Sequence, residues 1–72
     1  MKTSDIIAII KALGYFPEVV TLPMGVETIT IPFSLRVDPK TISEFRTVFK
    51  KTHYVNEVKA NRTKHFLLIT PR

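Results

Sequence analysis

The segment ETITIPFSLRVDPKTISEFRTVFKK, residues 27–51, decides the fold because its hydrophobic period changes abruptly at one point. Apolar side chains occupy every second position from Ile29 to Leu35, which is typical of a half-buried strand. Asp38-Pro39 follows, and Asp is a favoured helix N-cap while Pro suits the first helical position. The segment therefore predicts a strand followed by a capped helix that runs to about Lys51.

Two details of this segment make further predictions. Pro32 has no N–H to give to a β-ladder, so the strand should be an edge there, or end or bulge at that point. Helical spacing then places four apolar residues on one buried face of the helix. They are Ile42, Phe45, Val48 and Phe49.

Residues before this segment predict a helix and a short extended run. Thr3 or Ser4 can cap the helix, Asp5 suits its positive end, and Gly14 can supply a left-handed stop. Ile6, Ile9, Ile10 and Leu13 share one helical face. Residues 18–22 are rich in β-branched side chains, and Pro23-Met24-Gly25 predicts the turn that ends them.

The last third of the chain predicts a β-hairpin. Its arms are residues 53–60 and 63–70, and its turn is Asn61-Arg62 or a slightly longer loop, because Asn tolerates positive φ. The second arm is apolar on both faces, which favours a central position. Residues 1–72 are thus expected to form one small α+β domain. It has the order α-β-β-α-β-β, with a four-stranded antiparallel sheet and two helices on one face.

The composition narrows the class of protein. A hydrophobic fraction of 44% suits a folded domain, and the lack of Cys excludes disulfides and thiolate chemistry. No segment has the length and apolarity of a membrane span, and no signal-peptide pattern is present. We expect a cytoplasmic protein whose stability rests on packing.

The net charge of +5 is concentrated in the second half of the chain. Residues 1–35 hold two lysines against three carboxylates, a sum of −1, whereas residues 36–72 hold nine Lys or Arg against three carboxylates, a sum of +6. This asymmetry favours a polyanionic partner, nucleic acid first, and a solvated basic surface is the plainer alternative. The expected phosphate contacts are Arg36, Arg46, Lys50, Lys59, Arg62 and Lys64.

Catalysis, metal binding and cofactors are not expected. The predicted hairpin register separates His53 from His65 by about 16 Å and puts them on opposite faces, and a turn shifted by one residue still leaves about 13 Å. No serine has a nucleophile elbow, and the two glycines form no phosphate-binding loop. A small ribonuclease that uses one His with several cations is the remaining catalytic alternative.

Two stretches resemble a known family. MKTSDIIAIIKALGYF, residues 1–16, and ITIPFSLRVDPKTISEFRTVFKK, residues 29–51, are similar to segments of HicA-type messenger-RNA interferases. The resemblance covers about half of the chain and implies a fold like that of double-stranded-RNA-binding domains. The family's catalytic Gly-Ser-His motif is absent, and no His precedes Thr52. The resemblance therefore implies binding of RNA or protein without cleavage.

A protein-interaction module is the alternative function. It would be an inhibitor or accessory subunit with an acidic protein partner. The strand around residues 28–32 is expected to be an edge that pairs with another chain or with itself in a homodimer.

Overall fold

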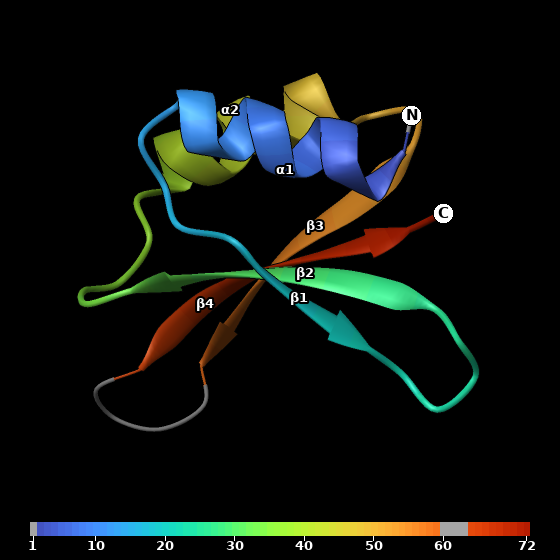
Figure 1. The fold of residues 1–72 in the computed structure, drawn as a ribbon. Coiled ribbons are helices and arrows are strands. Elements are labelled where there is room, and N and C mark those ends of the chain that lie inside the picture. Colours follow the sequence, from blue (N-terminus) through green and yellow to red (C-terminus); the bar gives the residue numbers. More distant parts are fainter. Residues whose placement is uncertain (1, 60–63) are drawn as a thin grey trace.

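The computed structural model describes residues 2–59 and 64–72 and contains two helices and four strands (Figure 1). In chain order the elements are α1 (Thr3–Ala12), β1 (Glu18–Thr21), β2 (Glu27–Phe33), α2 (Pro39–Val48), β3 (His53–Lys59) and β4 (His65–Pro71).

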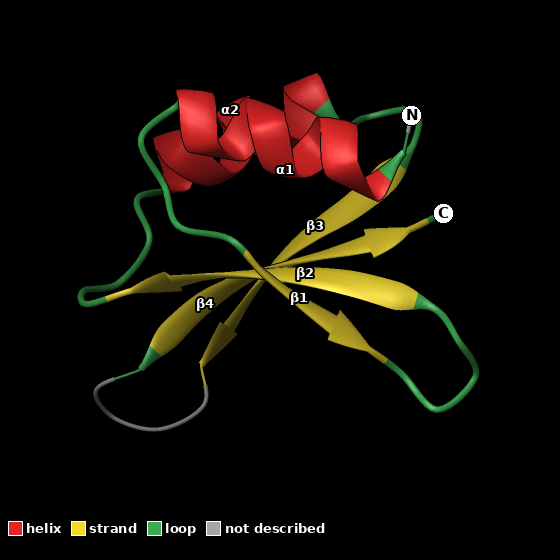
Figure 2. Ribbon diagram, in the orientation of Figure 1, coloured by secondary structure: helices red, strands yellow, loops and turns green. Residues whose placement is uncertain are grey.

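The four strands form one antiparallel sheet in the order β1-β2-β4-β3, so β1 and β3 are its edges. Both helices cover the same face of the sheet, and no helix of the described residues lies over the other face (Figure 2). The α+β class, the element order and the central position of the last strand are therefore confirmed. In the described residues, no helix has the length and apolar character needed to cross a bilayer.

Helix α1 begins one residue earlier than expected and ends as expected. Lys2, not Thr3 or Ser4, is the N-cap, and its backbone N–H donates to the Asp5 carboxylate over 3.1 Å. Gly14 has φ of 93°, its N–H donates to the Lys11 carbonyl, and the next N–H donates to the Ile10 carbonyl. This is a Schellman ending, which favours glycine because the left-handed conformation is strained for other residues.

Helix α2 begins at the predicted residue but is shorter than predicted. The Asp38 carboxylate accepts a hydrogen bond from the Lys40 N–H at 3.0 Å, with Pro39 as the first helical residue. The helix ends at Val48, because Phe49 already departs from helical geometry, so the prediction of Lys51 is wrong. Val48 is also half exposed instead of buried, since it lies at the rim of the helix pair.

Strand β2 is central, so the prediction of a pairing edge at residues 28–32 is wrong. Thr28 and Thr30 pair with β1, and residues 29–33 pair with β4. At Pro32 only β4 is present, because β1 begins opposite Thr30. The missing N–H therefore costs no ladder bond on the β1 side. The strand also ends at Phe33, so Leu35 is exposed, contrary to its predicted place on the buried face.

The hairpin differs from the predicted register by one residue. Lys59 pairs with His65 and Val58 with Phe66, whereas the expected turn paired Val58 with His65. A shift of one residue moves every side chain of one arm to the opposite face relative to the other arm. The turn itself, predicted at Asn61-Arg62 or as a slightly longer loop, falls on residues outside the described part of the chain.

The core fills the space between the helices and the sheet. Two isoleucines of α1, together with Phe45 and Phe49, meet the inward side chains of three strands. The Phe45 ring stacks on Phe49 at 6.2 Å and meets the Tyr15 ring edge to face at 5.4 Å. The buried apolar residues are Ile6, Ile10, Ile29, Ile31, Val37, Phe45, Phe49, Val55, Leu67 and Ile69. Strand β1 contributes none of them.

Candidate nucleic-acid interface

The predicted phosphate contacts that the structure describes lie along β3, including its last residue, Lys59, which pairs with the first residue of β4. Arg46 and Lys50 line one hollow, and Arg36 and Lys59 line a second. Lys64 is exposed and immediately precedes β4. Arg62, the sixth predicted contact, lies outside the described residues. We call Arg36, Arg46, Lys50, Lys59 and Arg72 the β3 strip.

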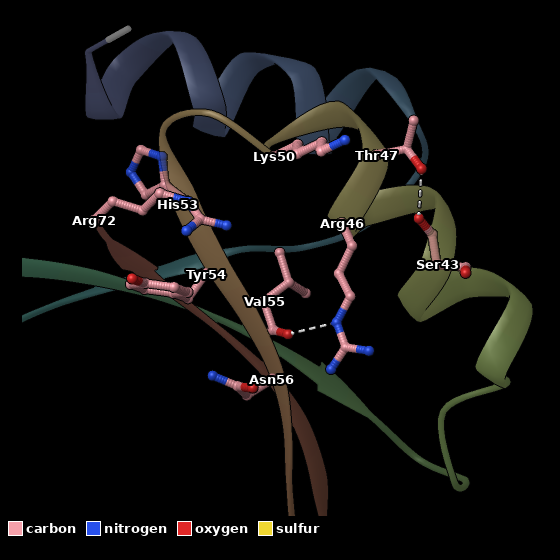
Figure 3. Close-up of a pocket in the computed structure, with 9 residues that line it drawn as sticks. All are labelled: Ser43, Arg46, Thr47, Lys50, His53, Tyr54, Val55, Asn56 and Arg72. Carbon is pink, nitrogen blue, oxygen red and sulfur yellow. Dashed lines mark hydrogen bonds between the residues drawn. The ribbon is translucent and has the colours of Figure 1, made fainter.

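The first hollow, of about 390 Å³, wraps around the outer edge of β3 (Figure 3). Arg46 reaches from α2 to β3, where its Nε–H donates to the Val55 carbonyl over 3.0 Å (Figure 3). This bond holds one cation in place before any ligand binds, which lowers the entropy cost of a phosphate contact. Lys50 follows α2 and adds a second charge beside it.

Arg72 is a member of this site that the sequence analysis missed. Its guanidinium carbon lies 4.1 Å from the centre of the Tyr54 ring, and its backbone N–H donates to the Thr52 carbonyl at 3.0 Å. A guanidinium at this distance over an aromatic face is a cation–π contact. The predicted hairpin runs its second arm back toward the start of β3, but only the observed register, with Tyr54 opposite Thr70, brings Arg72 within reach of the Tyr54 ring.

The second hollow, of about 270 Å³, lies at the other end of β3. Arg36, Lys59 and His65 line it together with Glu57. One Glu57 oxygen accepts a hydrogen bond from the Val37 N–H at 3.3 Å, which ties the loop before α2 to β3. The carboxylate offsets part of the local positive charge, so this end of the strip is a weaker anion site than the first hollow.

Two aromatic side chains are candidates for base stacking. Tyr54 is half exposed, although Arg72 already covers one face of its ring. Phe66 lies partly buried on the sheet face without helices, opposite Val58 and Pro32. Tyr54 is therefore the better stacking surface, since a base needs an accessible ring face.

His53 is a structural residue of this site. Its backbone N–H donates to the Phe49 carbonyl at 2.9 Å, and its ring lies edge-on to Phe49 at 6.2 Å. Burial lowers the pKa of His53, because it disfavours the charged imidazolium. Its Nδ1 is buried, and no residue among 2–59 and 64–72 gives it a hydrogen-bond partner.

The two histidines do not form a shared site. His65 is opposite Lys59, six positions along β3 from His53, which corresponds to about 20 Å. The described residues contain no group of three or more His, Cys, Asp or Glu side chains placed to hold a metal ion.

Comparison with known proteins yields no match among protein-family models, curated proteins or solved structures. The resemblance to HicA-type interferases therefore stays a prediction from two short stretches of sequence.

Proposed function

We propose that this protein binds nucleic acid without cleaving it, through phosphate contacts along the β3 strip. The observation that carries the proposal is the grouping of Arg46, Lys50 and Arg72 around one hollow beside a half-exposed tyrosine. Cations on a rigid support are what phosphate contacts require, and an aromatic ring adds sequence-tolerant stacking.

The members of the strip have different roles in this proposal. Arg46 is fixed by β3 and sets where the backbone of the nucleic acid lies. Lys50 and Lys59 are exposed point charges that follow the phosphates on either side. Arg72 and Tyr54 form a stacked pair that a base or a sugar-phosphate can approach from solvent.

The test compares lysines of equal charge in different places. Lys50→Gln and Lys59→Gln remove one charge each from the strip, whereas Lys11→Gln removes one from the last turn of α1. We expect each strip variant to weaken binding to short RNA and DNA several-fold and to lower the slope of log K against log salt by about 1. Lys11→Gln should change both quantities much less.

Two results would overturn the proposal. One is binding that does not depend on salt, or no binding to either nucleic acid. The other is an equal loss for Lys11→Gln, which would indicate attraction by net charge alone. Heparin serves as the polyanion control: equal affinity for heparin and for nucleic acid at two salt concentrations would reduce the site to a cation exchanger and leave an acidic protein as the alternative partner.

A further inference from the structure

Strand β1 is an edge with unpaired backbone groups. The Leu22 N–H donates to the Val26 carbonyl over 2.8 Å, so the backbone of Leu22 faces β2. Alternate residues of a strand direct their N–H and C=O groups to opposite sides. Val20 therefore also bonds toward β2, while Val19 and Thr21 direct theirs away from the sheet, where no residue among 2–59 and 64–72 meets them.

The chain around this edge is unusually apolar for a surface. Ten large apolar side chains are exposed in the described residues, and five of them fall within residues 16–24. These five are Phe16, Val19, Val20, Leu22 and Met24. Residues 16–33 contain no Lys or Arg. Edge strands are normally protected by charge, above all by lysine, so β1 lacks that protection against pairing with another strand.

We propose that β1 pairs antiparallel with β1 of a second copy of this chain, Val19 lying opposite the second copy's Thr21. In this register both outward residues of each strand give and accept hydrogen bonds. A shift by two residues in either direction sets Thr21 opposite Pro17, or Val19 opposite Pro23, and proline has no N–H to give. The two prolines that bound β1 therefore select one register.

A second copy suits this edge because the pairing is self-complementary. Val20 meets the second copy's Val20 across the two-fold axis, so apolar surface is covered on both chains. The backbones at Glu18 and at the second copy's Glu18 are four residues, or about 13 Å, apart along the paired strands, which exceeds the Debye length at physiological salt. The β3 strip lies at the far edge of the sheet, so two chains of charge +5 approach through edges whose residues 16–33 hold no Lys or Arg.

The dimer would have one continuous eight-stranded sheet. Its order, β3-β4-β2-β1 followed by the same strands reversed, leaves both β3 strips at the outer edges. Seven strand spacings put the two strips about 34 Å apart along the sheet. The pairing closes on itself and leaves no further free edge of the β1 kind, so the assembly stops at two copies.

Introducing a charge of either sign at Val20 tests the register directly, and sedimentation velocity measures the association. Wild-type protein should shift from monomer to dimer as its concentration rises. Val20→Lys and Val20→Glu should each weaken the dimer about tenfold or more, because like charges then face each other. An equal mixture of the two variants should regain the dimer as a mixed pair. Val58→Lys, on the other edge strand and of similar exposure, should leave association unchanged.

Amide exchange gives an independent reading of the same register. The Val19 and Thr21 amides should exchange slowly in concentrated samples and quickly in dilute ones, whereas the Val20 amide should be protected in both. A wild-type protein that stays monomeric at every concentration overturns the proposal and leaves this edge to a strand of another protein. Failure of the mixture to regain the dimer, or an equal loss for Val58→Lys, also overturns it.

Discussion

The two edges of the sheet are built in opposite ways. Strand β3 is held at two points: the Arg46 side chain of α2 donates to the Val55 carbonyl, and the carbonyl of the α2 C-cap, Phe49, accepts from the His53 N–H. Val55 is 3% exposed, so this edge also has a residue in the core. In β1 all four residues are exposed.

The difference shows how a small domain divides its surface. Ten buried apolar residues are enough to fill one layer between two helices and three strands, and β1 lies beyond the reach of that core. At β3, α2 places Arg46 and Lys50 beside the edge, and such cations oppose the addition of another strand. Where no helix reaches, the edge keeps both its backbone groups and its apolar side chains for a partner.

The same substitution on both edges gives the largest expected contrast. Val55→Ala removes two methyl groups from the core, and we expect it to lower the free energy of unfolding by about 2 kcal/mol. Val20→Ala removes them from a surface that is 44% exposed and should cost about 0.5 kcal/mol or less in dilute, monomeric protein. Urea unfolding measures both. Equal losses would show that β1 is packed as firmly as β3.

Removal of the Arg46 contact should make β3 more like β1. Arg46→Met keeps much of the aliphatic stem but leaves the Val55 carbonyl without its donor, at a cost of about 1 kcal/mol in unfolding free energy. It also opens the edge, so association should increase. Lys50→Met is the matched control, because it removes the same charge without a hydrogen bond to β3. If both variants behave alike, charge and not the Arg46 bond protects this edge.

Local signals in the sequence predicted the elements well. Asp38-Pro39 fixed the start of α2 because both residues act on the backbone next to them, and Gly14 fixed the end of α1 for the same reason. The alternation from Ile29 to Phe33 predicted correctly which face of β2 packs on the core, because successive side chains of a strand point to opposite faces whatever its neighbours are.

Signals that depend on distant partners were less informative. Pro32 predicted correctly that β2 has a neighbour on one side only at that point, but the prediction of an edge over residues 28–32 was wrong, because β1 pairs with Thr28 and Thr30. A hairpin register depends on the length and type of the connecting turn, so the two-residue turn expected from composition missed it by one residue. Arg72 was missed as a site residue because its contact with Tyr54 arises only when the sheet brings the chain end back.

Acidification gives the smallest effect, and it should act on the β3 edge alone. His53 is the first residue of β3, whereas β1 contains no histidine. Burial lowers the pKa of His53 below its usual 6.5 in the folded protein, so the unfolded chain binds the proton more tightly. The contribution of neutral His53 to the free energy of unfolding is therefore fully present above about pH 6.5. It falls as the pH drops below that value and levels off below the lowered pKa.

Thermal unfolding at about pH 8 and about pH 5 measures this loss. His53→Gln should remove the part of the acid dependence that arises from the imidazole, so that its unfolding temperature falls less between the two pH values than that of the wild type. His65→Gln is the matched control, since it leaves His53 in place at the start of β3. An acid dependence that survives His53→Gln unchanged would mean that the α2–β3 contact is indifferent to this proton and that the carboxylates alone produce the fall.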